Sequence, residues 1–359
     1  ITGSSGKTSL KELLSQCLNK IASTSYSKKS FNNKFGVPIS LFNIQKNNIF
    51  GVFEVGMDKK GEINHLTKLI MPDLGVITNI SYAHIKNFKN LYEIALAKSE
   101  MINNIVSGGS IVLNKDDKFF NFLSNQARKK GINVISFSSK KKADIFLLGI
   151  RRIKNHYRLK VIVNKKIFYF DTTYSTNNFI NNILACISVM FILNLNLNKM
   201  KKNFTSFKIP EGRGDIKIIK KYNKRFKFID ESYNANPLSM MSAIKNMNYY
   251  NGNKNHRKLV FLGDMLELGK KSKKLHRELS IVINKSDIDK VFVYGKYIRE
   301  TFNSLSTNKK GKVFDNLKEA YDHFGKIIRN NDLLMVKGSN ATGLNRFSKN
   351  IKKGQISAI

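Results

Sequence analysis

Hydrophobic positions in the N-terminal part of the chain alternate between helical and strand-like spacing. Apolar residues in 8–22 recur every three or four positions, which predicts an amphipathic helix. Short apolar runs and helical patterns then follow one another. The predicted strands are 49–55, 74–80, 110–114 and 133–137, and the predicted helices are 62–70, 92–105 and 118–130. Such alternation predicts a parallel sheet with helices on both faces.

The pattern changes after this stretch and then returns. Residues 143–174 contain short strand-like runs without helices, which predicts an antiparallel extension, and an apolar helix follows at 178–193. A proline and two glycines in 208–215 mark a hinge. Beyond it, strand patterns at 226–229, 258–262, 290–294 and 333–336 alternate with helices. We therefore predict an α/β protein with a central, P-loop-type parallel-sheet domain in 1–208 and a Rossmann-like α/β domain in 209–359.

The charge of the chain is strongly positive. Lys and Arg number 63 against 25 Asp and Glu, so the net charge is +38. Such an excess can indicate a nucleic-acid partner. However, abundant Lys, Asn, Ile and Phe with no Trp and only 4 Pro are typical of an AT-rich genome. The lysines are also scattered rather than clustered, so we expect no specific nucleic-acid partner.

Cysteine content and the apolar runs bear on the compartment. Cys17 and Cys186 lie in apolar helical patterns without metal-ligand spacing, which predicts buried free thiols in a reducing cytoplasm. The most apolar run, 183–193, is shorter than the ~20 residues that a membrane span needs. The chain starts with Ile1 directly before a phosphate-loop pattern. We therefore expect a fragment that has lost an N-terminal portion.

The phosphate-loop pattern is TGSSGKTS, from Thr2 to Ser9, at the start of the first predicted helix. Its glycines allow the backbone to approach phosphate oxygens, and a helix N-terminus attracts anions. Lys7 would contact the β- and γ-phosphates, and Thr8 would offer its hydroxyl to Mg²⁺. An ordinary Gly-Ser turn is the alternative. Ile1 stands where the commonest form of the motif has its first glycine.

The loop and a series of further motifs in the same order resemble the Mur ligase family over nearly the whole chain. The motifs are FGVPISL, EVGMDKKGEI, ITNISYAHIKNF, ALAKSEM, NNFINN, EGRGD, IDESYNANP, FLGDMLELG and VKGSN. SYNANP and GDMLELG are typical of the members that add D-alanyl-D-alanine to UDP-N-acetylmuramoyl-tripeptide during peptidoglycan synthesis. The resemblance implies ATP and Mg²⁺, an acyl-phosphate intermediate and a monomer. It also implies that the domain holding the uridine end precedes Ile1.

The resemblance assigns roles to residues of the first domain. It implies a nucleotide cradle of Gly3, Ser4, Ser5, Gly6, Lys7, Thr8 and Ser9, an adenine contact at Asn178, and metal ligands at Thr8, Glu54, His84 and Lys98. His84 alone would suit a capped or core histidine, but it follows the strand 74–80, where ligands gather. Lys98 matches a lysine that the family carbamylates with CO₂, which requires a neutral amine. Its alternative is a solvated helix lysine.

In the second domain the resemblance implies nucleotide contacts from Arg213, Asp230 and Glu231. It gives catalytic roles to Lys7, Lys98, His84 and Arg213, and it implies that Tyr233, Asn234, Asn236, Lys337 and Ser339 line the substrate site. A polar turn that caps the next helix is the alternative for the YNAN residues. Three positions depart from the family pattern: Glu231 replaces an aspartate, Asn340 an arginine and Asn177 a histidine.

Two other functions remain open from the sequence. One is another ATP-dependent amide ligase, similar to folylpolyglutamate synthase, which shares the phosphate loop but not SYNANP. The other is a basic nucleic-acid-binding protein with an idle ligase site.

Overall fold

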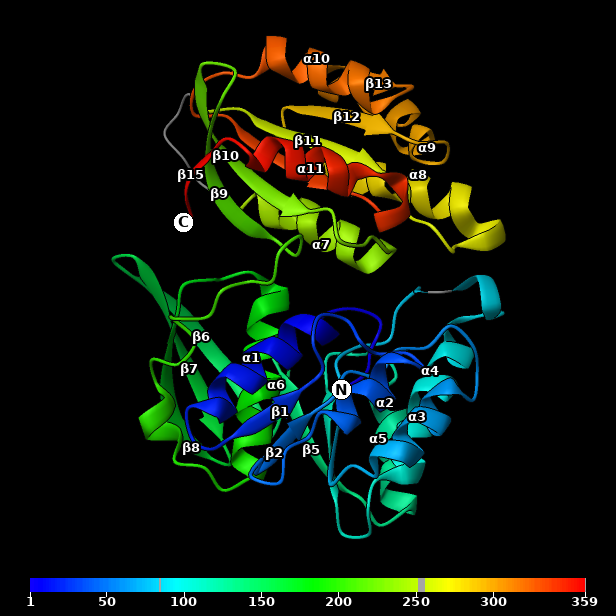
Figure 1. The fold of residues 1–359 in the computed structure, drawn as a ribbon, viewed down its shortest axis with the longest axis vertical. Coiled ribbons are helices and arrows are strands. Elements are labelled where there is room, and N and C mark those ends of the chain that lie inside the picture. Colours follow the sequence, from blue (N-terminus) through cyan, green and yellow to red (C-terminus); the bar gives the residue numbers. More distant parts are fainter. Residues whose placement is uncertain (84, 251–255, 359) are drawn as a thin grey trace. The chain divides into compact units, whose positions relative to one another are not determined.

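The computed structural model describes residues 1–83, 85–250 and 256–358, which form two compact units, Ile1–Phe207 and Lys208–Ile359 (Figure 1). Each unit is an α/β sandwich built around its own sheet. The two-part α/β architecture predicted from the alternating pattern is confirmed.

The sheet of the first unit has six strands in the order β3-β4-β5-β6-β7-β8. The parallel strands are β3 (Leu74–Ile77), β4 (Ser110–Asn114), β5 (Asn133–Ser138) and β6 (Ile145–Ile153). The last two, β7 (His156–Val163) and β8 (Lys166–Thr172), are antiparallel and confirm the predicted extension. A separate parallel pair consists of β1 (Thr24–Tyr26) and β2 (Phe50–Val52).

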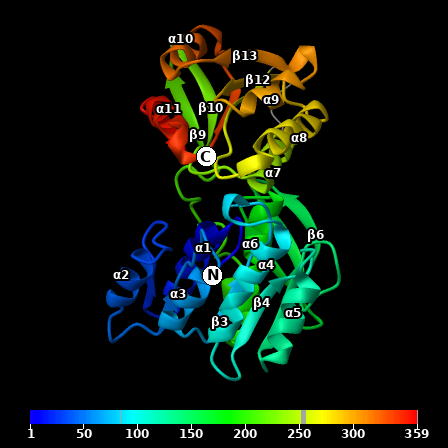
Figure 2. The same ribbon diagram turned by 90° about the vertical axis from the view of Figure 1, so that its right-hand side faces the viewer.

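Helices cover both faces of this sheet. The helices are α1 (Lys7–Asn19), α2 (Gly36–Phe42), α3 (Glu62–Ile70), α4 (Leu91–Ser99), α5 (Phe120–Lys129) and α6 (Asn177–Ile192). Figures 1 and 2 show α1 and α6 on one side of the strands and α3, α4 and α5 on the other. The predicted helix 92–105 is wrong in its second half, because a 3₁₀ turn at Glu100–Asn104 follows α4.

The first two residues complete the sheet between β2 and β3. The Ile1 amino group donates to Phe53 O (2.7 Å), and Ile1 O accepts from Val55 N (2.8 Å). On the other side, Thr2 N donates to Val76 O (2.8 Å) and Thr2 O accepts from Thr78 N (3.0 Å). Ile1 and Thr2 therefore occupy a strand position with a hydrogen-bonded neighbour on each side. The phosphate loop follows at the carboxyl end of this position, where ligands of α/β proteins bind.

The sheet of the second unit has seven strands in the order β13-β12-β11-β14-β10-β9-β15. They are β9 (Asp215–Lys221), β10 (Lys224–Glu231), β11 (Lys258–Gly263), β12 (Lys290–Tyr294), β13 (Lys310–Phe314), β14 (Leu333–Lys337) and β15 (Gln355–Ala358). Strand β9 is antiparallel to both of its neighbours, β10 and β15, and the other pairs of these strands are parallel. The helices are α7 (Pro237–Met247), α8 (Ser272–Asn284), α9 (Ile298–Asn303), α10 (Leu317–Ile327) and α11 (Leu344–Lys352).

Phenylalanine fills much of the core of the second unit. Phe261 on β11 contacts Phe347 and Phe324, with ring centroids 5.0 and 5.4 Å apart, and Phe292 lies 4.9 Å from Phe324. Edge-on and tilted aromatic pairs of this kind add to the stabilisation from area burial. The high Phe content of the chain thus serves a packed core.

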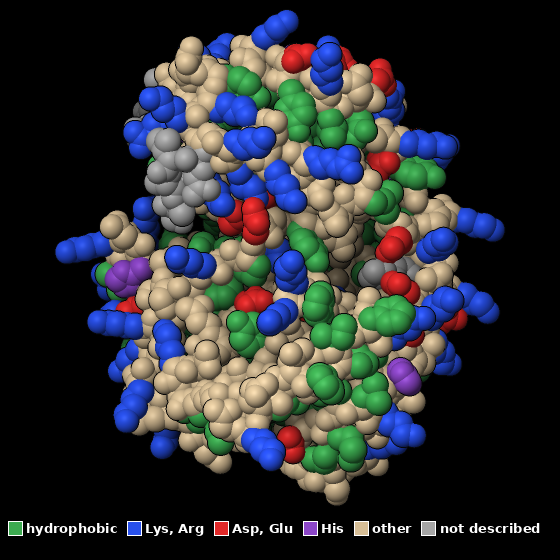
Figure 3. Space-filling model, viewed as in Figure 1, with side chains coloured by type: hydrophobic (Ala, Val, Ile, Leu, Met, Phe, Trp, Pro, Cys, Tyr) green, Lys and Arg blue, Asp and Glu red, His purple; other side chains and the backbone are tan. Residues whose placement is uncertain are grey.

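Lysine and arginine side chains are spread over the face seen in Figure 3, among tan and green surface. This distribution matches the scattered lysines of the sequence. In the part of the chain that the structure describes, no helix is both long enough and apolar enough to cross a membrane. Cys17 and Cys186 are buried free thiols, as predicted.

Candidate active site

The phosphate loop is fixed to the residues that follow β3. Ser4 N donates to Asn79 O (2.9 Å), and the Ser4 hydroxyl donates to Ser81 O (2.9 Å). The Asn79 side chain accepts from Ser5 N (3.0 Å) and donates to Ser5 O (3.0 Å). This network fixes the shape of the loop through hydrogen bonds within the protein, which lowers the entropic cost of binding phosphates.

Gly3 and Gly6 have backbone conformations that favour glycine, with φ of 146° and 84°. A Cβ at Gly3 would lie 1.9 Å from Thr78 Oγ1, and a Cβ at Gly6 would lie 3.1 Å from Asn182 Oδ1. A side chain at Gly3 would therefore collide with Thr78, whereas one at Gly6 would require Asn182 to shift by a few tenths of an ångström.

Helix α1 begins directly after the loop, at Lys7, so Lys7, Thr8 and Ser9 occupy its first turn. The backbone N–H groups of a first turn have no acceptor inside the helix and attract anions. The Lys7 ammonium donates to Gly3 O (2.9 Å), which holds its charge beside the loop. The arrangement suits the phosphates of a nucleotide.

Thr8 and Glu54 form a buried pair of oxygen donors. The Thr8 hydroxyl donates to Glu54 Oε2 (2.7 Å), and Asn32 donates to Glu54 Oε1 (2.7 Å). The exposed fractions of Thr8 and Glu54 are 3% and 1%. A hydroxyl and a carboxylate are hard oxygen ligands, and Mg²⁺ takes one or two of them together with substrate phosphates. The residues present therefore fit Mg²⁺.

No group of three or more His, Cys, Asp or Glu side chains in residues 1–83, 85–250 and 256–358 has the arrangement of a metal site. These residues therefore form no metal site closed by protein ligands alone. An Mg²⁺ ion held partly by substrate phosphates does not require such a site. His84, predicted as a further ligand, lies outside the described residues.

Lys98, in the last turn of α4, has an exposed fraction of only 2%. Burial, and secondly the charge of Lys7, lowers the pKa of Lys98 well below its ordinary value. Its ammonium has no hydrogen bond or ion pair with any residue that the structure describes. Lys98 is therefore not a solvated helix lysine, and its lowered pKa favours the neutral amine, which is the form that attacks the carbon of CO₂.

Asn178 is the second residue of α6 and is exposed. One turn further along, Asn182 is buried and lies against Gly6 of the phosphate loop. The start of α6 and the loop therefore belong to one site in the first unit.

The hinge segment of the second unit packs on the end of β10. Gly214 N donates to Asp230 O (2.7 Å), and Gly212 O accepts from Tyr233 N (3.0 Å). The Arg213 guanidinium lies over the Tyr233 ring, 4.0 Å from its centroid. Tyr233 thereby limits the directions in which Arg213 extends.

Asp230 and Glu231 have different surroundings. Asp230 is buried, accepts from Ser232 Oγ (2.6 Å) and pairs with Lys352 (2.7 Å). Glu231, at the strand end, accepts from Lys337 Nζ (3.0 Å). Of the two, Glu231 has the more exposed side chain, at 21% against 2%.

Ser339 connects three loops at the carboxyl ends of neighbouring strands. Its hydroxyl accepts from Leu266 N (2.9 Å) and donates to Ala235 O (3.3 Å), and Lys337 Nζ donates to Asn234 O (3.1 Å). Asn236 caps α7, since its side chain accepts from Ser239 N (2.9 Å). The capping alternative therefore describes Asn236, while Lys337 and Ser339 hold the backbone of Asn234 and Ala235 at the strand ends.

Sequence reasoning missed several residues that shape these sites. They are Lys11, Ser30, Asn32, Thr78, Asn79 and Asn182. Thr78 and Asn79 had a usable signal, because polar residues close the apolar strand pattern 74–80. Asn32 and Ser30 had none, since they lie in a loop without periodicity.

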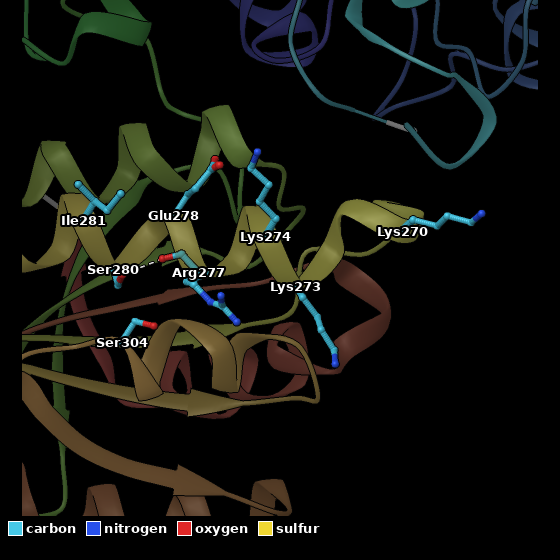
Figure 4. A pocket seen from close by; sticks show the side chains of 8 residues that line it. All are labelled: Lys270, Lys273, Lys274, Arg277, Glu278, Ser280, Ile281 and Ser304. Carbon is cyan, nitrogen blue, oxygen red and sulfur yellow. Dashed lines mark hydrogen bonds between the residues drawn. The ribbon is translucent and has the colours of Figure 1, made fainter.

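A pocket beside α8 is lined by eight residues, four of which are basic (Figure 4). The lining residues are Lys270, Lys273, Lys274, Arg277, Glu278, Ser280, Ile281 and Ser304. Figure 4 shows Lys270, Lys273 and Lys274 extending in different directions. Arg277 is paired with Glu300 (2.8 Å). The pocket contains none of the predicted site residues, and its charges do not converge on one point.

Substitution of Gly3 by alanine is expected to weaken ATP binding about 10-fold or more, since the new methyl group would displace Thr78 and deform the phosphate cradle. Calorimetric titration with ATP measures the effect. Gly108→Ala is the matched control, because Gly108 also has positive φ (73°) but open space around the added Cβ. It should retain ATP affinity. Normal ATP affinity in Gly3→Ala would show that the loop is not the phosphate cradle.

Comparison with known proteins gives consistent matches over nearly the whole chain. Residues 1–190 match the Mur ligase middle domain, and residues 216–340 match the Mur ligase, glutamate ligase domain. The UDP-N-acetylmuramoyl-tripeptide–D-alanyl-D-alanine ligase of Buchnera aphidicola (subsp. Baizongia pistaciae) is 32% identical, with 96% of this chain and 73% of the relative covered. The Rickettsia prowazekii enzyme of the same name is 30% identical, with 97% and 76% covered.

A solved structure, MurF ligase from Thermotoga maritima in complex with ADP, has a TM-score of 0.85 at 25% identity. The match covers 99% of this chain and 79% of that one.

Proposed function

The chain belongs to the Mur ligase family, and from that premise we propose that it uses ATP to join UDP-N-acetylmuramoyl-tripeptide to D-alanyl-D-alanine through an amide bond. The names of its relatives supply the two substrates. The observation in the structure that carries the proposal is the preformed phosphate loop ending at the buried Thr8–Glu54 pair. The loop offers donors for the phosphates and the Thr8–Glu54 pair offers oxygen ligands for Mg²⁺. Transfer of a phosphoryl group from ATP in the first step requires both.

The reaction we propose has two steps. A carboxylate oxygen of the tripeptide attacks the γ-phosphorus of ATP, the bond to the β-phosphate oxygen breaks, and ADP leaves. The amine of D-alanyl-D-alanine then attacks the acyl carbon, the amide forms, and inorganic phosphate leaves while the nitrogen loses a proton. Phosphoryl transfer needs positioning and charge stabilisation more than covalent help from the protein.

Residues of the first unit would bind the nucleotide. The backbone of Gly3 to Ser9 would donate to phosphate oxygens, and Lys7 would hold the β- and γ-phosphates with a fixed positive charge. Thr8 and Glu54, with His84 and a carbamylated Lys98, would hold Mg²⁺. The chemistry that bound Mg²⁺ supplies is neutralisation of charge on the phosphate oxygens. Asn178 would contact the adenine.

Residues of the second unit would contact the nucleotide phosphates, the ribose and the amine substrate. We propose that Arg213 reaches nucleotide phosphates and that Glu231, rather than the enclosed Asp230, contacts the ribose. Lys337, Ser339, Asn234 and Tyr233 would line the amine site, where a fixed lysine and aligned hydroxyls orient polar substrate groups. Asn236 supports that loop through its helix cap.

The test is ADP release from ATP and Mg²⁺ with each acceptor alone and with both. We expect release above background only when UDP-N-acetylmuramoyl-tripeptide and D-alanyl-D-alanine are present together, with the amide product found by mass spectrometry. L-alanyl-L-alanine is the stereochemical control. A reduced folate with glutamate tests the related amide-ligase alternative. Release with the folate pair and none with the muramoyl pair would overturn the proposal.

A further inference from the structure

Lys11 is a charged side chain completely enclosed by the first unit. It lies on α1 one turn after Lys7, and its exposed fraction is 0%. Its ammonium donates to Ser27 O (2.5 Å) and Lys29 O (2.6 Å), and it pairs with Glu12 Oε1 (2.7 Å). A buried cation is tolerated only where such partners satisfy it. Lys11 therefore ties α1 to a specific backbone segment, residues 27–32, which we name the 27–32 loop.

The 27–32 loop starts at the end of β1 and returns to the metal-ligand pair. Ser27 N donates to Val52 O (3.1 Å), and the Ser27 hydroxyl accepts from Glu54 N (3.3 Å). Lys29, one of the two carbonyl acceptors of Lys11, has a left-handed backbone with φ of 50°. That conformation is unfavourable for lysine and persists where the surroundings hold it.

Two side chains of the 27–32 loop contact the Thr8–Glu54 pair directly. Ser30 Oγ lies 3.3 Å from Thr8 Oγ1, and Asn32 donates to Glu54 Oε1 (2.7 Å). Asn32 O also accepts from Gly56 N (2.7 Å), which closes the loop on the segment after Glu54. The orientation of both oxygen donors therefore depends on a loop whose other end is held by Lys11.

We propose that Lys11 is a positioning residue for divalent-cation binding: by holding the carbonyls of Ser27 and Lys29 it keeps Ser30 and Asn32 against the Thr8–Glu54 pair. This inference rests on the proposed use of Mg²⁺ with ATP at this pair. The Lys11 ammonium donates to the carbonyls of Ser27 and Lys29 and pairs with Glu12, and none of these three residues belongs to the phosphate loop. Replacing Lys11 should thus lower the affinity for Mg²⁺ and leave the affinity for ATP without metal unchanged.

The experiment compares Lys11→Met with Lys20→Met. Lys20 follows the same helix, but its contacts are with Asn203 and Ser206 on the exposed side of the unit. ATP binding is measured by calorimetry in EDTA and over a series of Mg²⁺ concentrations. Partners that orient metal ligands typically contribute 10–100-fold in metal affinity, so Lys11→Met should raise the half-saturating Mg²⁺ concentration about 10-fold or more. Its ATP affinity in EDTA and both values for Lys20→Met should match wild type.

Hydrogen–deuterium exchange of peptides covering residues 27–32 is the second readout. Lys11→Met should exchange faster there without any ligand, whereas Lys20→Met should not. Lys11→Gln keeps an amide donor and is the milder variant if Lys11→Met does not unfold cooperatively; it should show the same two changes to a smaller degree. An unchanged Mg²⁺ requirement, or an equal loss of ATP affinity in EDTA, would overturn the role of Lys11. Failure of wild type to show Mg²⁺-dependent ATP binding would instead overturn the proposed function.

Discussion

Replacing Lys7 with alanine is expected to lower the rate of acceptor-dependent ADP release by about 10²-fold or more, because preorganised charge at the transferring group carries much of the barrier reduction. The structure already holds the Lys7 ammonium beside the loop, 2.9 Å from Gly3 O. Little reorganisation is then needed when phosphates arrive. The rate is measured with saturating ATP, Mg²⁺ and both acceptors, so that weaker ATP binding does not mask the catalytic effect.

Two variants make the Lys7 result specific. Lys129→Ala removes an exposed lysine from the last turn of α5 and should retain the wild-type rate, which controls for the lost charge alone. Lys7→Arg keeps the positive charge but replaces a compact ammonium by a planar fork, so it should recover only part of the rate. A Lys7→Ala enzyme that turns over like wild type would remove Lys7 from phosphoryl transfer.

Much of this architecture follows from local pattern. The strand β4 (Ser110–Asn114) and the helix α3 (Glu62–Ile70) coincide with the predicted segments, because buried parallel strands and amphipathic helices each leave a clear period. The phosphate loop was predicted for a different reason. Its glycines, lysine and threonine are the residues that one local geometry requires, a tight turn leading into a helix N-terminus.

Other parts depend on contacts that no local pattern reveals. The β1 strand, Thr24–Tyr26, has three residues and owes its existence to pairing with β2, 24 or more residues later. The order of the second sheet places β14 between β10 and β11, which is decided by side-chain packing over long sequence separations. Lys11 looks like an ordinary helix lysine in a lysine-rich chain, and only its burial distinguishes it.

The same limit applies to the residues after β10. Asn234 and Asn236 carry identical side chains in one motif, yet Asn236 Oδ1 accepts from Ser239 N and caps α7, whereas Asn234 Oδ1 accepts from Ala235 N inside the turn. Their different positions on the turn determine these contacts, and composition cannot separate them. The helix cap thus belongs to Asn236, while the Asn234 side chain bonds the backbone within the turn.

Replacing Lys98 with alanine is expected to reduce ADP release by about 10²-fold, comparable to losing one preorganised charged group of an active site. Burial, followed by the charge of Lys7, lowers the pKa of Lys98, so the amine is neutral above that lowered value. A neutral amine adds to CO₂ and loses one proton to give an anionic carbamate. The new negative charge would face Lys7 favourably, whereas the unmodified ammonium is repelled by it.

A carbamate on Lys98 would be recognised by rescue with small acids, by dependence on CO₂ and by loss of activity at acid pH. Acetate or formate should restore part of the activity of Lys98→Ala by supplying the missing carboxylate. Lys68→Ala, at an exposed position in the last turn of α3, should be fully active and insensitive to these acids.

Wild type should lose activity in CO₂-depleted buffer and regain it with bicarbonate. As the pH falls through the lowered pKa, the amine takes up a proton, so this CO₂-dependent activity should be lost on the acid side. Complete absence of acid rescue together with indifference to CO₂ withdrawal would show that Lys98 acts as an unmodified amine.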